Sequence, residues 1–289
     1  MKKILITGGR GFFASRFAKY YKDQYEILAP TKAEMNVSDE QDIMKKFQAF
    51  KPDYVIHTAA IAVTDYCNQN PEMAYKINVE GAISIAKATQ AVGAKLVFIS
   101  TEQIFNGNQN SGPFKETDEA KPDTVYGQNK LEAERLIKEI IEELWIVRFT
   151  WLFGMPERNC GMSGNLLWDT ITAILKNEQI AASPHEFRGV TYVYEMVEAV
   201  NKIFTVPYGT YHLGSENNKS RYEIIKEIFC GLGVESRIQD LVVEDKEKYS
   251  KKNRDVRLDN QKAKSHGIAF HNSSDAIMKC IVEYGLKLK

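Results

Sequence analysis

One tyrosine and one lysine lie four residues apart in Tyr126-Gly127-Gln128-Asn129-Lys130. Residues at this spacing share one face of a helix, so the ammonium of Lys130 would lie beneath the phenol of Tyr126. A nearby cation favours the phenolate and lowers the pKa of a tyrosine from its usual value of about 10. Such a tyrosine can deliver a proton to a carbonyl oxygen near neutral pH. We therefore predict acid catalysis by Tyr126, tuned by Lys130.

The Tyr-x-x-x-Lys spacing occurs twice, so it does not identify the site by itself. Tyr222 and Lys226 repeat it. Only the first copy begins a predicted helix that follows a strand ending in hydroxyls, Ser100-Thr101. We interpret Tyr222 and Lys226 as a pair on a helix surface.

A glycine-rich loop with the sequence Thr-Gly-Gly-Arg-Gly-Phe-Phe-Ala occupies residues 7–14. Glycines allow a tight turn and the approach of a pyrophosphate, and a helix N-terminus supplies free N–H groups and a positive dipole end. The loop lies between a first strand and a first helix, which predicts dinucleotide binding. The predicted cofactor contacts in this loop are Gly8, Gly9, Arg10, Gly11, Phe12 and Phe13.

The end of the second predicted strand bears on the choice of cofactor. An NAD site usually has Asp or Glu about 20 residues beyond the glycines. Residues 28–33 contain no acid, but they contain Lys32, and Arg10 lies within the glycine loop. Both cations could pair with a 2′-phosphate, and both could equally be solvated surface charges. We predict NADPH, with NADH as the alternative.

The elements that must position these residues alternate along the first half of the chain. Short apolar runs at 3–7, 25–29, 53–57, 95–100 and 145–149 predict strands. Helical patterns at 12–21, 39–50, 71–92 and 123–143 separate them. This alternation indicates βαβ units and a parallel sheet. We predict an α/β fold, a Rossmann-type doubly wound parallel sheet.

The regular alternation ends near residue 150, which suggests a division into two parts. We predict a dinucleotide-binding domain over residues 1–151 and a smaller substrate-binding lobe over residues 152–289. The boundary is open, because the chain from about 185 to 215 could return to the sheet.

Composition and charge disfavour several classes of protein. The 289 residues carry 38 basic and 38 acidic side chains, so no bulk charge attracts nucleic acid or an anionic membrane. The four cysteines lie at least 50 residues apart, which suggests neither a zinc site nor a disulfide framework. The five histidines show no ligand spacing. We expect a cytoplasmic monomer or homodimer without a metal.

Several stretches together resemble the extended short-chain dehydrogenase/reductases, and within them the dTDP-4-dehydrorhamnose reductases. The similarity spans nearly the whole chain and is strongest before residue 155. The stretches that carry it are the glycine loop and residues 51–60, 75–79, 97–101, 105–107, 125–127, 147–154 and 209–212.

The resemblance implies hydride transfer from NADPH to the C4 ketone of a nucleotide-linked 6-deoxy-4-keto sugar. By match to the family motif, Tyr126 would donate the proton and Lys130 would hold the nicotinamide ribose. Thr101 would hydrogen-bond the carbonyl oxygen, with Ser100 beside it on the cofactor side. Trp151 would pack against the apolar face of the sugar, or it would belong to the ordinary core.

Other positions of the family motif bear on cofactor and substrate. Ala59 and Ala60 would let the cofactor backbone pass close to the third strand. The acid that follows Ser-Thr is aspartate in the family and is here the longer Glu102. A family turn, Gly-x-Pro-Thr, is here Arg188-Gly189-Val190-Thr191, and a family Arg-Pro appears as Arg254-Asp255.

The arginines at these altered positions could clamp a diphosphate, since a planar guanidinium pairs with phosphate oxygens in bidentate fashion. We therefore take Glu102, Arg188 and Arg254 as candidate substrate-binding residues. The loop over residues 155–163 is also longer than the family's usual loop.

Two alternatives to this reductase stay open. One is another nucleotide-sugar reductase or an epimerase that uses the same Tyr126 and Lys130. The other is a non-catalytic NADP-binding protein like the regulatory subunit of methionine adenosyltransferase, which shares the fold and some motifs. The intact Thr101, Tyr126 and Lys130 argue against a mere binder, whereas the altered residues 102, 103 and 188–190 keep it open.

Overall fold

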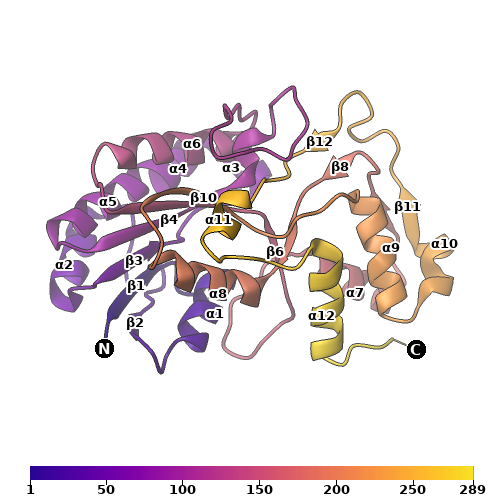
Figure 1. Cartoon of the computed structure of the whole chain (residues 1–289), viewed down its shortest axis with the longest axis horizontal. Coiled ribbons are helices and arrows are strands. Elements are labelled where there is room, and N and C mark those ends of the chain that lie inside the picture. The colour runs from indigo at the N-terminus through magenta and orange to yellow at the C-terminus, as the bar shows by residue number, and fades with distance from the viewer. Residues whose placement is uncertain (289) are drawn as a thin grey trace.

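A six-stranded parallel sheet organises the first part of the molecule (Figure 1). The structure is a computed structural model, and it describes residues 1–288. The strand order is β10-β5-β4-β3-β1-β2. The strands are β1 (Lys3–Thr7), β2 (Glu26–Leu28), β3 (Tyr54–His57), β4 (Lys95–Thr101), β5 (Leu144–Phe149) and β10 (Gly209–Leu213). Because the order reverses between β1 and β3, a crevice opens beyond the carboxyl ends of these two strands, where ligands bind in such sheets.

Helices cover both faces of the sheet, as the predicted doubly wound fold requires. Side chains alternate along β1, so Ile4 and Ile6 pack in a cluster with Phe17, while Leu5 packs in another cluster with Phe47. The first face carries α1 (Phe12–Tyr20) and α8 (Val193–Ile203). The second face carries α2 (Glu40–Phe50), α5 (Gly81–Ala91) and α6 (Val125–Lys138).

The long helix expected at residues 71–92 is continuous but irregular. It comprises α4 (Pro71–Tyr75), a π-helical stretch at Lys76–Glu80, and α5; α3 (Thr64–Gln69) precedes it. π-Helical turns are frequent at functional sites, and this one carries the buried Asn78. The helix expected at 123–143 is shorter than predicted, because α6 ends at Lys138.

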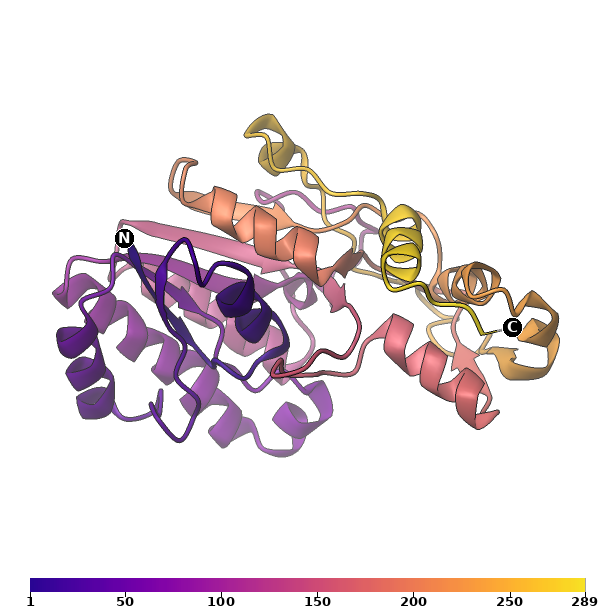
Figure 2. The ribbon, with the colours of Figure 1, turned by 90° about the horizontal axis from the view of Figure 1, so that it is seen from below.

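The second part of the molecule packs its own apolar core around Phe153 and Phe229. Figure 2 shows its helices gathered at the end of the molecule away from α2 and α5. The helices are α7 (Leu166–Lys176), α9 (Arg221–Gly231), α10 (Ile238–Leu241) and α12 (Ser273–Glu283), with α11 (Gln261–Ser265) against β10. Three short parallel pairs complete it: β6 (Trp151–Phe153) with β9 (Val190–Tyr192), β7 (Ile180–Ala182) with β11 (Val242–Glu244), and β8 (Glu186–Phe187) with β12 (Arg254–Asp255).

The chain crosses between the two parts more than once. After β9, helix α8 packs against α1, and β10 pairs with β5 in the main sheet. Residues 193–213 therefore lie with the dinucleotide-binding part. Among the described residues 1–288, no helix has the length and apolar character needed to cross a bilayer.

Candidate active site

The glycine loop is pressed against the ends of two neighbouring strands. Gly8 has φ +70°, and a Cβ there would lie 3.1 Å from the Cα of Ala59. A Cβ on Gly9 would lie 1.9 Å from the carbonyl oxygen of Ala29, so no residue with a side chain fits at this position. Gly11 begins α1 without a side-chain cap, and the first turn of α1 carries no acid. The N–H groups and positive dipole end of this helix are therefore available to a pyrophosphate.

A cavity of about 660 Å³ lies beside this loop, over the crevice between β1 and β3. Arg10 and Lys32 both line it, and neither forms an ion pair within residues 1–288. Glu34 is not among the lining residues, and its carboxylate accepts a hydrogen bond of 2.8 Å from the backbone N–H of Thr31. The cavity thus offers two cations and no carboxylate to a ribose 2′-phosphate, which fits NADPH. Its lining also contains Gly8, Gly11, Asn36, Ala59, Ala60 and Ile61.

Two buried side chains hold the segment that follows β3. Thr7 Oγ1 accepts hydrogen bonds from the N–H groups of Thr58 (3.1 Å) and Ala59 (3.0 Å), so its own hydrogen goes to His57 Nδ1 at 2.8 Å. Burial and the charge of Lys130 lower the pKa of His57 to about 3, which keeps the ring neutral and accepting. His57 is thus a satisfied core residue, as its place at a strand end suggests.

Asn78 is a positioning residue that the sequence analysis did not single out. Its Oδ1 accepts from the N–H of Ile61 at 2.8 Å, and its Nδ2 donates to the carbonyl of Ile61 at 3.0 Å. Ile61 belongs to the lining of the first cavity. In the sequence, this residue could have been noticed only as a single asparagine within a helical pattern of Ala, Ile and Val.

A second cavity, of about 530 Å³, brings most of the predicted catalytic and substrate residues together. Gly11 and Thr58 line both cavities, so the two cavities adjoin at these residues. The structure therefore places a dinucleotide cradle beside a cluster of hydroxyl, phenol and cationic groups. The second lining includes Phe12, Phe13, Ser100, Thr101, Glu102, Tyr126, Trp151 and Arg188.

The expected lowering of the Tyr126 pKa is wrong for this chain. Burial of the phenol and the negative charge of Glu102 raise the pKa of Tyr126, because both destabilise a phenolate. The ammonium of Lys130 instead lies 3.8 Å from the ring centre of Phe98, and burial lowers the pKa of Lys130 to about 7 despite the charge of Glu134. Tyr126 therefore stays protonated over the neutral range and is poised to donate.

Glu102 and Arg188 meet inside the cleft. The carboxylate of Glu102 is 1% exposed and accepts from Arg188 Nη2. Burial raises the pKa of Glu102, while the charges of Arg188 and Arg254 oppose the rise. The guanidinium of Arg188 lies 4.7 Å from the ring centre of Trp151, and that of Arg221 lies 5.8 Å from it.

The predicted substrate contact at Arg254 differs in the structure. Arg254 is not part of the cavity lining, because its guanidinium binds Glu186 at 2.6 Å. Burial works against ionisation of Glu186, but Arg188, Arg254 and Arg221 outweigh it and hold its pKa below the usual range. Arg221 was not singled out in the sequence, since a single arginine at the start of a helix gives no signal.

A buried network of ion pairs and hydrogen bonds joins helix α6 to the main sheet. Ser100 Oγ donates to Glu134 Oε1 at 2.5 Å, so Ser100 offers only lone pairs to the cleft. Arg148 binds Glu134 through Nη2 at 2.7 Å and Nε at 3.0 Å, and its Nη1 donates to His212 Nε2 at 3.2 Å. The network ties α6 to β4, β5 and β10, which fixes the helix that carries Tyr126.

Known proteins resemble the chain along most of its length. The family model described as RmlD substrate binding domain matches residues 1–285. The spore coat polysaccharide biosynthesis protein SpsK of Bacillus subtilis is 31% identical over 85% of this chain and 84% of its own. The dTDP-4-dehydrorhamnose reductase of Aggregatibacter actinomycetemcomitans is 31% identical over 79% of each chain. The crystal structure of the Bacillus anthracis dTDP-4-dehydrorhamnose reductase with NADP superposes with a TM-score of 0.86, at 25% identity over 98% of this chain and 99% of that one.

Proposed function

The chain belongs to the RmlD substrate binding domain family, and from that premise we propose that it is an NADPH-dependent reductase of a nucleotide sugar. The reaction is reduction of the C4 ketone of a nucleotide-linked 6-deoxy-4-keto sugar, the chemistry of a dTDP-4-dehydrorhamnose reductase. One observation carries the proposal: Thr101 and Tyr126 line the cavity that adjoins the dinucleotide cradle at Gly11 and Thr58. NADH is the alternative cofactor, and the working form is a monomer or a homodimer.

The residues of the cradle fit a dinucleotide with a 2′-phosphate. The backbone at Gly8 and Gly11 and the open start of α1 would hold the pyrophosphate. Arg10 and Lys32 would pair with the 2′-phosphate, and Ala59 and Ala60 would pack against the adenosine half. When bound, the reduced nicotinamide supplies the hydride.

Tyr126 and Thr101 would act on the ketone oxygen. The protonated phenol of Tyr126 donates its proton as negative charge develops on that oxygen. The hydroxyl of Thr101 accepts from the N–H of Gln103 at 3.2 Å and hydrogen-bonds the phenol of Tyr126, so it would turn its hydrogen to the same oxygen when substrate binds. Glu102 keeps the proton on Tyr126 until an alkoxide forms, because its charge disfavours the phenolate.

The far side of the cleft would hold the sugar and the diphosphate. The indole of Trp151 presents a flat apolar surface for a deoxyhexose, with guanidinium groups of Arg188 and Arg221 beside it. The Nε atoms of Arg188 and Arg221 are buried and have no hydrogen-bond partner within residues 1–288. Buried donors normally have partners, so phosphate oxygens of a ligand are the natural acceptors.

The test follows NADPH absorbance with enzymatically prepared dTDP-4-keto-6-deoxy sugar. We expect one equivalent of NADPH oxidised for each equivalent of sugar, with NADH less effective at equal concentration. Oxidation only with another nucleotide's keto sugar would move the assignment to that substrate. A cofactor retained through purification and sugar interconversion without net oxidation would indicate an epimerase. Tight NADPH binding without turnover of any keto sugar would indicate a non-catalytic NADP-binding protein.

A further inference from the structure

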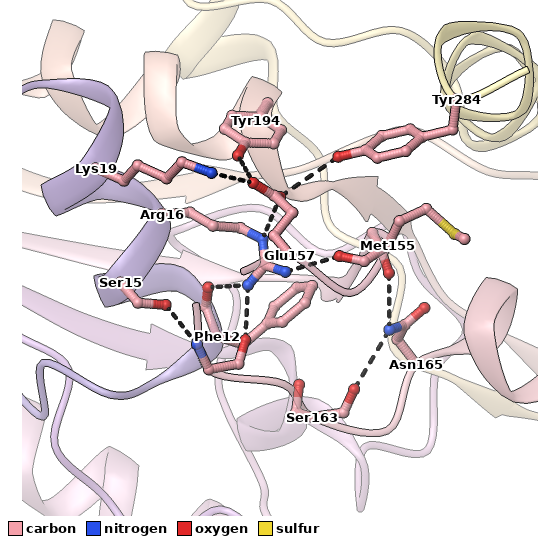
Figure 3. A network of polar contacts seen from close by, with 12 residues as sticks. Phe12, Ser15, Arg16, Lys19, Met155, Glu157, Ser163, Asn165, Tyr194 and Tyr284 are labelled. Atoms are coloured by element: carbon pink, nitrogen blue, oxygen red, sulfur yellow. Dashed lines mark hydrogen bonds and ion pairs between the residues drawn. The ribbon is translucent and has the colours of Figure 1, made fainter. Parts of the chain in front are cut away.

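The segment over residues 155–164 joins β6 to α7 and is fastened to α1 by a buried arginine (Figure 3). We call this segment the strap. Arg16 on α1 is fully buried. Its Nη1 donates to the carbonyls of Phe12 (2.9 Å) and Gly161 (2.8 Å), and its Nη2 donates to the carbonyl of Met155 (2.8 Å). One side chain thus binds the strap at two points, Met155 and Gly161, to the helix that begins at the glycine loop.

Glu157, near the start of the strap, adds further contacts to α1. Its carboxylate accepts from Arg16 Nε (3.1 Å), Lys19 Nζ (3.0 Å), the Tyr194 hydroxyl (2.6 Å) and the Tyr284 hydroxyl (3.4 Å). Figure 3 shows these donors converging on the carboxylate from α1, from α8 and from the chain after α12. Glu157 therefore links the helix of the cofactor loop to the second part of the molecule.

The strap touches the cofactor loop directly at Gly161. The N–H of Gly161 donates to Ser15 Oγ at 3.0 Å. A Cβ on Gly161 would lie 1.7 Å from the carbonyl oxygen of Arg10, so any side chain there would force two backbones apart. Arg10 and Gly11 belong to the lining of the dinucleotide cavity. The position of the strap thus constrains the position of the cofactor loop.

The far end of the strap reaches the second cavity. Ser163 and Gly164 line that cavity together with Gly11. Asn165 fixes this end, because its Nδ2 donates to the carbonyls of Gly154 (3.1 Å) and Ser163 (3.3 Å). The strap therefore packs on the glycine loop at one point and lines the second cavity at another.

We propose that the docked strap positions the glycine loop for the dinucleotide, and that undocking of the strap controls release of the cofactor. Arg16 and Glu157 are positioning residues in this proposal, since they act through Gly161 and the loop. The proposal rests on the cofactor assignment of the proposed function. The physical reason is that a glycine loop has wide backbone freedom, so its N–H groups bind a pyrophosphate well only when another element fixes them.

The first experiment measures cofactor release from the Gly161→Ala variant. NADPH dissociation is followed by stopped-flow fluorescence, and the melting temperature is measured on the same samples. We expect release faster by roughly ten- to a hundredfold, the effect of displacing a binding element by about 1 Å, without a matching loss of melting temperature. Arg158→Ala and Met162→Ala are the matched controls, because both side chains are exposed on the same strap.

The outcomes separate positioning from general stability. A dissociation rate within about twofold of the unaltered chain would overturn the proposal, given the usual scatter of single contacts. The proposal would also be overturned if release became faster in Gly161→Ala and in both controls, in proportion to the loss of melting temperature in each. If the unaltered chain bound no NADP(H), the cofactor assignment itself would fail, and this proposal would fail with it.

A second measurement uses trypsin cleavage at Arg158, which is exposed on the strap. If the docked strap strengthens cofactor binding, thermodynamic linkage requires that the bound cofactor stabilise the docked strap by the same free energy. We expect NADP⁺ to slow cleavage after Arg158 but not after Lys251, an exposed residue of a separate loop. Glu157→Gln should speed the first cleavage only. Equal effects of NADP⁺ at both positions, or none at Arg158, would contradict coupling between strap and cofactor.

Discussion

Replacing Lys130 by methionine should stabilise the folded chain while abolishing turnover. Lys130 is 2% exposed, and within residues 1–288 its ammonium has no ion-pair partner. Burial lowers the pKa of Lys130 from 10.5 to about 7, although the charge of Glu134 opposes this. A desolvated ammonium is unfavourable to folding, whereas methionine has a similar shape and no charge. Stability is thus lost at the position that, by the resemblance, would hold the nicotinamide ribose.

The size of the effect follows from the pKa. Between pH 7 and 10.5 the unfolded chain keeps a proton on Lys130 that the folded chain has released, so stability rises with pH in that window. The penalty is fully present below pH 7 and vanishes above 10.5. A full proton of difference contributes about 1.4 kcal/mol per pH unit, which gives about 2 kcal/mol between pH 7 and 9 after allowing for half-protonation at pH 7. At pH 7 the whole penalty is about 4 kcal/mol, an upper bound on the gain from methionine.

The assay is urea unfolding of the cofactor-free chain at pH 7, 8 and 9. We expect Lys130→Met to be more stable than the unaltered chain at pH 7, with the difference shrinking towards pH 9. Lys226→Met is the matched control, because Lys226 has the same spacing from Tyr222 but is only partly buried on α9. If Lys130→Met were no more stable at pH 7 and showed the same pH slope as the unaltered chain, the reasoning about this buried ammonium would be refuted.

Three further outcomes test the proposed site. Tyr126→Phe should lower kcat by about 10²- to 10⁴-fold with NADPH affinity unchanged, whereas Tyr222→Phe should keep full activity; substantial turnover by the first variant would remove Tyr126 as proton donor. Arg10→Glu combined with Lys32→Glu should raise KM for NADPH by at least about tenfold more than KM for NADH, and equal changes would refute pairing with a 2′-phosphate. Trp151→Ala should weaken binding of the nucleotide sugar, measured by calorimetry, by more than about tenfold while NADPH binding holds; the opposite ranking would make Trp151 a core residue.

Much of the first half could be predicted from the sequence because its signals are local. Buried parallel strands read as apolar runs, and β1, β3 and β5 lie within one residue of the predicted ranges. The glycine loop was readable because its chemistry depends on residue type and order. Apart from β10, the second half has strands of two or three residues, which are too short to show a period.

The candidate site combines local motifs with distant partners. The sequence marked Thr101, Tyr126 and Glu102, and the structure brings them into one cavity with Trp151 and Arg188. The amino-acid pattern did not indicate that Arg254 would bind Glu186 rather than line that cavity. Pairing of charges across 68 residues depends on the path of the intervening chain.

The prediction for the Tyr126 pKa failed for a related reason. Spacing on a helix placed Lys130 on the same face as Tyr126, which is correct as helix geometry. The pKa, however, depends on burial and on the nearest charge, which is that of Glu102 from the end of β4. Neither quantity is encoded in four residues of sequence.

The sequence by itself determined the fold class, the dinucleotide loop and the residue types available for hydride and proton chemistry, because these follow from local pattern and order. Only the tertiary structure decided the protonation of Tyr126 and Lys130, the supports at Asn78 and Glu134, and the seating of residues 155–164 on the cofactor loop. Desolvation, hydrogen-bond satisfaction and steric contact arise between segments distant in sequence, and they exist only once the chain has folded.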